Sequence, residues 1–110
     1  MNKILIMGHL GADPTFKDFG NGTMCANFNM AVSEHQKDKN GESVKITEWF
    51  RCIAWGKTAE FINKNAKKGC KAFVDGKFKT RIYKDNNGEE QKVGEIVVDR
   101  FELLTWLDNG

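Results

Sequence analysis

TEWFRCIAWGK, residues 47–57, is the segment from which the fold can be read. Side chains alternate between the two faces of a strand, so this segment presents one uncharged face and one mixed face. The uncharged face is expected to point into a core or toward a subunit contact, and consists of Phe50, Cys52 and Ala54. The mixed face is expected to point outward, although Ile53 fits that position poorly, and consists of Trp49, Arg51, Ile53 and Trp55.

The chain before this segment predicts two further strands and a hairpin. Residues 4–7 are a short apolar run, interpreted as a first strand that ends at the turn signals of residues 11–14. Residues 18–22 read as a tight loop. Residues 25–34 alternate in polarity and predict a half-buried strand with an apolar face of Ala26, Phe28, Met30 and Val32. Asn40-Gly41, within residues 37–42, is a strong signal for a hairpin tip.

The chain after this segment predicts one helix and two strands. Residues 57–68 carry apolar side chains at helical spacing and predict a short helix that Gly69 ends. Residues 71–83 predict a strand whose apolar face is Ala72, Val74 and Phe78 and whose basic face is Lys71, Lys77, Lys79 and Arg81. Residues 84–88 hold a second Asn-Gly hairpin signal, and residues 93–104 predict the last strand. This order of three strands, one short helix and two strands predicts an all-β protein, built as a small barrel or a curled sheet.

Size and composition are typical of one globular domain. The chain has 110 residues, of which 40% are hydrophobic and 29% are charged. No apolar run approaches the roughly 20 residues of a membrane span, and the N-terminal run is too short for a signal peptide. Cys25, Cys52 and Cys70 are odd in number and widely spaced, which argues against a disulfide framework and a zinc site. We therefore expect a cytoplasmic protein with reduced thiols and no membrane partner.

The distribution of charge is more informative than the net charge of +2. Residues 57–84 carry nine lysines and arginines against two acids, a net charge of +7. Residues 85–110 carry two basic residues against seven acids, a net charge of −5. A basic block of this size favours an anionic partner.

The pairing of aromatic and basic side chains points to unpaired nucleic acid. Every base has a π-face that can stack on an exposed aromatic ring, and cations beside the ring can follow the phosphates. The segment 47–57 has this pairing, and the next basic strand repeats it with Lys77, Lys79 and Arg81 in phase with Tyr83. The alternative interpretation, that the tryptophans are core or corner residues and the lysines an ordinary solvated face, stays open at this point.

The sequence offers no candidate for catalysis or for a cofactor. His9 and His35 have no cysteine or carboxylate at the spacing of metal ligands. Motifs of hydrolases, nucleotide-binding loops and metalloproteases are missing from the sequence, and no carboxylate cluster of the kind a nuclease uses is visible. We therefore expect no catalytic residues, no metal and no cofactor.

Five blocks of the chain resemble bacterial single-stranded DNA-binding proteins in order and spacing: NKILIMGHLGADP, ANFNMAVSE, TEWFRCIAWGKTAE, KKG and DGKFKTRIYKDNNG. The resemblance runs from Met1 to about Leu104. It implies an OB-fold domain over residues 1–107, which is a five-stranded barrel with one short helix between strands 3 and 4 and agrees with the order of elements above. It also implies a homotetramer whose subunits associate partly through their first strands. It also implies single-stranded DNA wrapped around the outside, bound without sequence specificity and protected during replication, recombination and repair, in the cytoplasm at the nucleoid.

The resemblance carries over to particular positions. Trp49 and Trp55 match stacking aromatics of the family, and Tyr83 matches a position often held by Trp. The matching basic positions are Lys3, Arg51, Lys57, Lys68, Lys79 and Arg81, to which the basic strand adds Lys77. Gln36 stands where well-studied members have a further stacking Trp, so one platform is missing. Residues 108–110 stand where the family begins a C-terminal tail that recruits replication and repair proteins; such partners are expected only if a tail exists outside this chain.

Two rival functions remain open on the sequence. The first is a primosome-type OB module that hands single-stranded DNA to a helicase. The second is an OB-fold scaffold for protein interaction, which predicts that Trp49 and Trp55 pack at a subunit interface.

Overall fold

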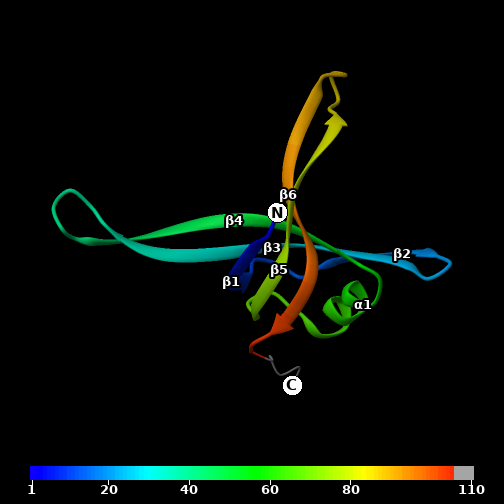
Figure 1. Ribbon diagram of the computed structural model, residues 1–110, viewed down its shortest axis with the longest axis horizontal. Coiled ribbons are helices and arrows are strands. Elements are labelled where there is room, and N and C mark those ends of the chain that lie inside the picture. Colours follow the sequence, from blue (N-terminus) through cyan, green and yellow to red (C-terminus); the bar gives the residue numbers. More distant parts are fainter. Residues whose placement is uncertain (106–110) are drawn as a thin grey trace.

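A computed structural model describes residues 1–105 of the chain (Figure 1). Over these residues the elements follow in the order β1 (Ile4–Leu10), β2 (Thr15–Gly20), β3 (Thr23–Lys37), β4 (Ser43–Trp55), α1 (Gly56–Asn65), β5 (Lys71–Lys84) and β6 (Glu90–Leu103). The predicted domain boundary at residue 107 and the predicted tail segment 108–110 lie outside the described residues. No helix in residues 1–105 is long and apolar enough to cross a membrane.

Five of the strands close into a barrel. β1 pairs antiparallel with β5 on one side and, through His9 and Leu10, with β3 on the other. β3 pairs with β4, β4 runs parallel to β6 at Cys52 and Ile53, and β6 returns to β5. The helix α1 joins β4 to β5, which are the third and fourth strands of the barrel. The predicted five-stranded barrel with one helix between strands 3 and 4 is confirmed.

The strand β2 was not predicted. It pairs antiparallel with the first part of β3, from Thr15 opposite Asn27 to Gly20 opposite Thr23. The prediction of a loop over residues 18–22 is wrong for Asp18 to Gly20, because only Asn21 and Gly22 form the turn. Nearly all of β2 is exposed, so it lacks the apolar alternation that marks a core strand and is held by backbone pairing.

Alternation in the barrel strands places the core where the sequence predicts it. Ala26, Phe28 and Met30 of β3 are buried, as are Cys52 and Ala54 of β4, and Phe50 is half-buried. The helix adds Ala59 and Ile62, and the remaining strands contribute Ile6, Leu10, Ala72, Val74, Ile96 and Val98.

The helix α1 ends earlier than predicted. Asn65 is its last residue, and Ala66 has an extended backbone (φ −88°, ψ 141°) while its N–H still donates to the carbonyl of Ile62 at 2.9 Å. Lys67 and Lys68 therefore lie outside the helix. Gly69, at φ 90°, lies in the turn before β5 rather than at the helix end.

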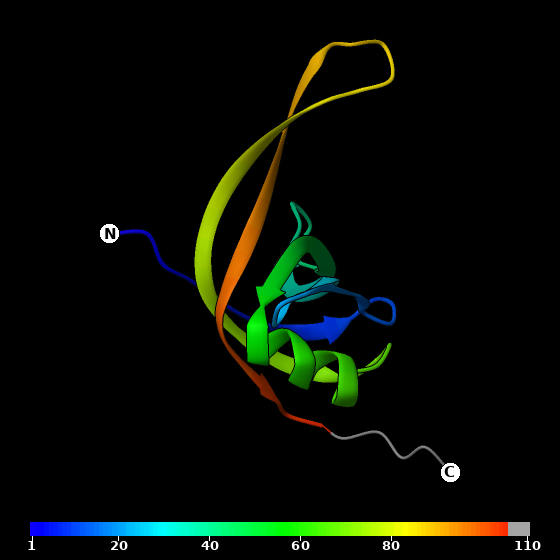
Figure 2. The same ribbon diagram turned by 90° about the vertical axis from the view of Figure 1, so that its right-hand side faces the viewer.

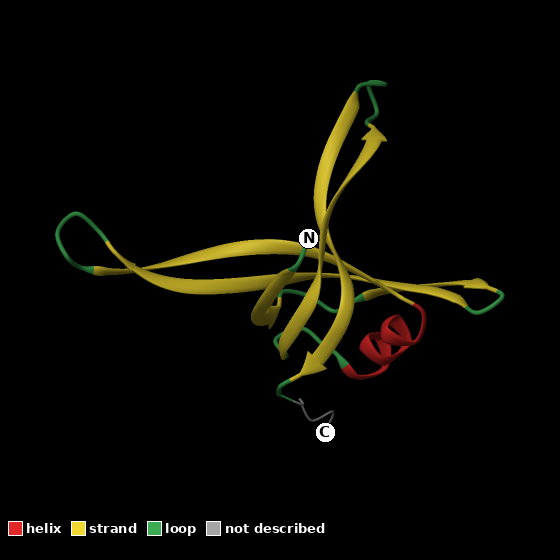
Figure 3. Cartoon of the chain, in the orientation of Figure 1, coloured by secondary structure: helices red, strands yellow, loops and turns green. Residues whose placement is uncertain are grey.

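Three hairpin arms extend from the barrel (Figures 1 and 3). We call them the β2–β3 arm (residues 15–27), the β3–β4 arm (residues 33–47) and the β5–β6 arm (residues 77–95). Both predicted Asn-Gly tips are confirmed, and they share one hydrogen-bond pattern. Oδ1 of Asp38 accepts from the N–H groups of Asn40 and Glu42 at 2.9 Å. Oδ1 of Asp85 accepts from those of Asn87 and Glu89 at 2.9 and 3.0 Å.

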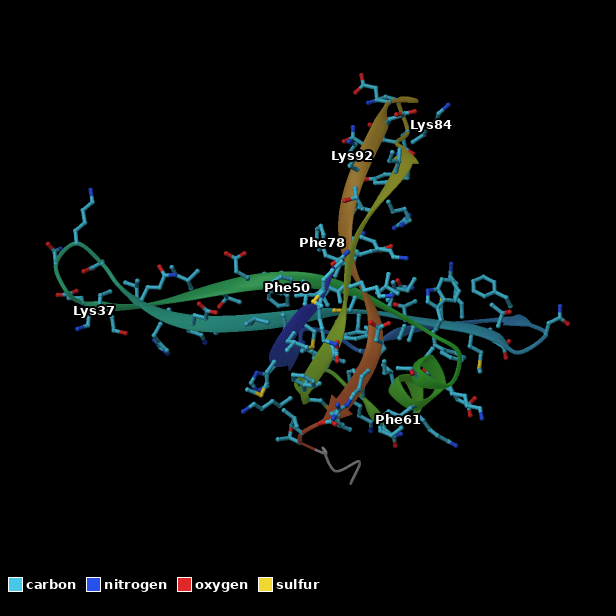
Figure 4. All side chains as sticks on the ribbon, viewed as in Figure 1. Lys37, Phe50, Phe61, Phe78, Lys84 and Lys92 are labelled. Carbon is cyan, nitrogen blue, oxygen red and sulfur yellow. The ribbon has the colours of Figure 1, made fainter. Side chains whose placement is uncertain are left out.

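Phe78 corrects a further prediction. It was expected to face the core with Ala72 and Val74, but about half of its surface is exposed. The reason is that β5 leaves the barrel after the buried Gly76, as Figure 2 shows from the side. The Phe78 ring lies over Gly94 of β6 instead, where a Cβ would come within 2.4 Å of its Cζ. Figure 4 shows Phe78 at the base of the β5–β6 arm.

Candidate nucleic-acid interface

The outer face of β4 carries the aromatic and basic side chains that the sequence placed there. Trp49 is 61% exposed and Trp55 is 48% exposed, and Arg51 between them is exposed as well. Ile53 is half-buried, which fits its position in the middle of the sheet between Asn27 of β3 and Val97 of β6. The expectation that both tryptophans face outward is confirmed, and neither is a core residue of the single chain.

Strand pairing continues this face across the sheet. Asn29 of β3 lies opposite Arg51, and Ile53 lies opposite Val97, which in turn lies opposite Lys77 of β5. Because paired residues share a face, β3, β4, β6 and β5 present one continuous surface. We call this surface the outer sheet face. Its exposed basic and aromatic residues on β5 are Lys77, Lys79, Arg81 and Tyr83.

Two arginines from separate strands meet on the outer sheet face. Arg51 of β4 and Arg81 of β5 line one cavity of about 290 Å³. The rest of its wall consists of Ala12, Asp13, Thr15, Asn27, Phe28 and Asn29. Two guanidinium groups outnumber the one carboxylate, that of Asp13, so the recess has a net positive charge and hydrogen-bond donors suited to a phosphate.

Arg81 has fixed neighbours within this surface. Its Nε donates to Oε1 of Glu95 at 3.3 Å, and the Glu95 side chain is buried while that of Arg81 is more than half exposed. Its guanidinium carbon lies 6.0 Å from the centre of the Tyr83 ring, the outer limit for a cation–π contact. Glu95 therefore anchors Arg81 from below and leaves its remaining N–H groups facing solvent.

Each tryptophan has a specific support. The Trp49 ring lies against Gly11, where a Cβ would come within 2.4 Å of Cζ3 of the indole. A side chain at residue 11 would therefore displace the ring. The Trp55 ring is stacked near Phe19 of β2, with ring centres 6.4 Å apart and an angle of 26° between the planes. Phe19 was missed in the sequence, because the loop predicted over residues 18–22 gave no reason to place it beside Trp55.

The other predicted basic residues lie outside the arginine cavity. Lys3 forms an ion pair with Asp75 at 2.9 Å, and Lys57 lines a separate cavity with Phe61 and Arg100. The backbone N–H of Lys68 donates to Oδ1 of Asp13 at 2.8 Å, which ties the turn after α1 to the loop after β1. Gln36 is exposed on the β3–β4 arm, away from both tryptophans in the sheet register.

Titratable groups give no sign of a reactive centre in residues 1–105. Among them no cluster of three or more histidines, cysteines, aspartates or glutamates could hold a metal ion. Burial raises the pKa of the Cys52 thiol from 9.0 to about 12, so this thiol stays protonated at neutral pH. The pKa of Asp85 is lowered, chiefly because its carboxylate accepts a hydrogen bond from the backbone N–H of Glu89. The N–H of Asn87 and the side-chain amide of Gln91 also donate to it, and together they favour the ionised carboxylate at the hairpin tip.

The fold and the outer sheet face together define an OB-fold barrel with an exposed aromatic and cationic surface. Comparisons with known proteins agree. The model of the single-strand binding protein family matches residues 1–104, so the chain belongs to that family. Single-stranded DNA-binding protein 1 of Chlorobaculum tepidum is 37% identical, over all of this chain and 68% of its own length. The solved Plasmodium falciparum SSB complex with ssDNA matches with a TM-score of 0.84 and 29% identity, covering 98% of this chain and 96% of that one.

Proposed function

We propose that this chain binds single-stranded DNA on its outer sheet face, by base stacking and phosphate contacts and without sequence preference. The observation that carries the proposal is the arrangement of Trp49 and Trp55 on one exposed face with Arg51 between them. Membership of the single-strand binding protein family and the likeness to an SSB complex with ssDNA support it.

The physical chemistry of this face favours unpaired strands. Stacking on an indole needs an exposed base face, which a duplex hides, and it contributes roughly 1–3 kcal/mol per base whatever the base. The nearby guanidinium and ammonium groups are positioned to neutralise phosphates, so affinity falls as salt rises. We infer that Trp49, Trp55 and Tyr83 are the stacking residues. The basic residues that follow the backbone are Lys3, Arg51, Lys57, Lys68, Lys77, Lys79 and Arg81.

The role in the cell follows from such binding. A protein that coats exposed strands without regard to sequence protects them from nucleases and re-annealing during replication, recombination and repair. We place this protein in the cytoplasm at the nucleoid, which suits its three buried, unpaired cysteines. We propose no covalent chemistry for it.

Self-association through β1 is part of the proposal. Only His9 and Leu10 of β1 pair with β3, so the earlier residues leave one strand edge unpaired. Leu5 and Met7 are 56% and 52% exposed there, beside a cavity of about 440 Å³ that Val32, Ile46 and Phe50 also line. An unpaired edge with exposed apolar side chains is a surface on which a second copy can add its own strand. We propose that this contact builds a homotetramer.

A titration tests the proposed binding. The protein is titrated at low salt with oligo(dT) of increasing length and, separately, with a duplex of matched length, while tryptophan fluorescence is recorded and light scattering gives the mass. Strong quenching by oligo(dT) alone is expected. Equal binding of duplex would reject the proposal, and unchanged fluorescence would reject it in favour of a protein-interaction scaffold. Leu5→Arg with Met7→Arg should lower the mass; an unchanged mass would reject the β1 contact alone.

A further inference from the structure

Phe19, near the tip of the β2–β3 arm, and Trp55, at the end of β4, form a pair of half-exposed, nearly parallel rings. Phe19 is 58% exposed, although it is a large apolar side chain on a strand edge. Its ring centre lies 6.4 Å from that of Trp55, with 26° between the planes. A core role does not account for such exposure, because neither ring is buried among the residues described.

The backbone fixes Phe19 in this position. Thr15, Lys17 and Phe19 alternate onto one side of β2, and Lys17 lies opposite Cys25, which lies opposite Trp55. The register shifts between Asp18 and Gly20, so Phe19 has no partner on β3. The N–H of Gly20 donates to Oδ1 of Asp18 at 2.9 Å and closes the bulge. Bulges of this kind re-aim a side chain and are frequent beside binding sites.

Phe19 lies on an exposed arm, where its ring can move relative to Trp55. A ring inserted between two others requires about 7 Å between their planes, twice the roughly 3.5 Å at which carbon atoms touch. The distance between ring centres is 6.4 Å, which is an upper limit for the spacing between the planes, so the Phe19 side chain must move outward to admit a base. The ammonium group of exposed Lys17 is on the same side of β2, where it can meet the adjoining phosphate.

We propose that Phe19 is a base-binding residue that works with Trp55, so that one unpaired base is held between the two rings. This proposal rests on the proposed function, since it assumes that the strand reaches Trp55. It extends the path of the strand from the barrel onto the β2–β3 arm, a segment to which no role was assigned from the sequence.

The test compares Phe19→Ala, Phe19→Leu and Phe19→Tyr with the unmodified protein in binding to oligo(dT). Phe19→Ala should weaken binding about 5- to 150-fold, the range for loss of one stacked base. Phe19→Leu keeps an apolar side chain but has no π-face, so it should also weaken binding. Phe19→Tyr keeps an aromatic ring and should bind as tightly as the unmodified protein. Leu104→Ala, which shortens an exposed apolar side chain just after β6, is the control and should change nothing. Thermal unfolding of each variant checks that the barrel is intact.

An oligonucleotide of abasic nucleotides tests whether Phe19 acts through a base. Mere support of Trp55 predicts that Phe19→Leu has no effect in a Trp55→Leu background, whereas base contact by Phe19 leaves a further loss there. If Phe19 contacts a base, the difference between the unmodified protein and Phe19→Leu vanishes on the abasic strand. The losses from Phe19→Leu and Trp55→Leu on oligo(dT) should then be less than additive, because both rings hold the same base. Additive losses, or unaltered affinity in Phe19→Ala while the unmodified protein binds, would overturn this proposal alone. If the unmodified protein does not bind oligo(dT), both proposals fall.

Discussion

Glu95 is the buried carboxylate beneath the exposed guanidinium of Arg81, at 3.3 Å from its Nε. It is the one buried charged residue in the described chain, and it lies opposite Lys79 on the strand pairing of the outer sheet face. An acid in this position holds a cation in place and also repels phosphate. The two effects can be separated by a substitution that removes the charge and keeps the shape.

Glu95→Gln is expected to tighten binding of oligo(dT) about 2- to 5-fold at low salt, because a negative charge is removed from beside the phosphate path. The gain should disappear at high salt. Fluorescence titration over a range of salt concentrations measures both. Glu42→Gln is the control, since Glu42 lies in the turn at the tip of the β3–β4 arm. Weaker binding by Glu95→Gln at low salt would mean that anchoring of Arg81 matters more than repulsion.

Gly11→Ala is expected to weaken binding although residue 11 itself presents no side chain to DNA. The added Cβ would come within 2.4 Å of the Trp49 ring and push the indole from its platform position. We expect a loss approaching that of Trp49→Ala, with the midpoint of thermal unfolding nearly unchanged. A Gly11→Ala protein that keeps full affinity would show that the ring position is not critical.

Trp49→Ala and Trp55→Ala are each expected to weaken binding by roughly 1–3 kcal/mol, by a similar amount for oligo(dT) and for mixed-sequence strands. Both rings are substantially exposed, so the folded barrel should survive. Titration by fluorescence anisotropy with a labelled strand avoids dependence on the tryptophans themselves. If either variant fails to fold, the substituted tryptophan is needed for the barrel itself, and the stacking interpretation is rejected at that position.

Lys79→Ala and Arg81→Ala are expected to reduce the slope of log affinity against log salt by about one unit each. Each removes one cation from the outer sheet face while leaving the stacking rings in place. Lys64→Ala serves as the control, because Lys64 lies in the last turn of α1 and not on the outer sheet face. If the slope of log affinity against log salt is the same for Arg81→Ala and Lys64→Ala, Arg81 does not contact phosphate.

Stability should depend on Cys52 in alkaline solution. Burial raises the folded-state pKa to about 12 from 9.0, so folding favours the protonated thiol. That contribution is complete below pH 9.0 and is lost as pH rises toward about 12, at up to roughly 1.4 kcal/mol per pH unit. Urea unfolding at several pH values should show a steeper alkaline decline in the wild type than in Cys52→Ala. Equal declines would indicate a thiol open to water.

The barrel strands were predictable because a strand with one buried face needs apolar side chains at every second position. Phe28 and Met30 on β3, and Cys52 and Ala54 on β4, are buried for that reason. The same rule placed Trp49 and Trp55 outside.

The arms were less predictable, because no core constrains them. Phe78 lies on the same face of β5 as Val74, but it stands beyond the point where β5 leaves the barrel. Its ring therefore packs on Gly94 instead of in the core. Phe19 depends on a strand whose pairing is carried by backbone groups and a bulge. Backbone pairing of this kind requires no particular side-chain pattern, so the sequence does not predict it. The contact between Phe19 and Trp55 is visible only in the structure.

The protruding arms give the molecule a large hydrodynamic size for its mass. The Cα radius of gyration is 16.0 Å and the extents are 56 × 45 × 31 Å, whereas a compact chain of this length has a radius of gyration of about 13 Å. Such a shape experiences more friction in solution than a sphere of the same mass. Gel-filtration columns calibrated with compact standards would therefore overstate the molar mass of a single subunit.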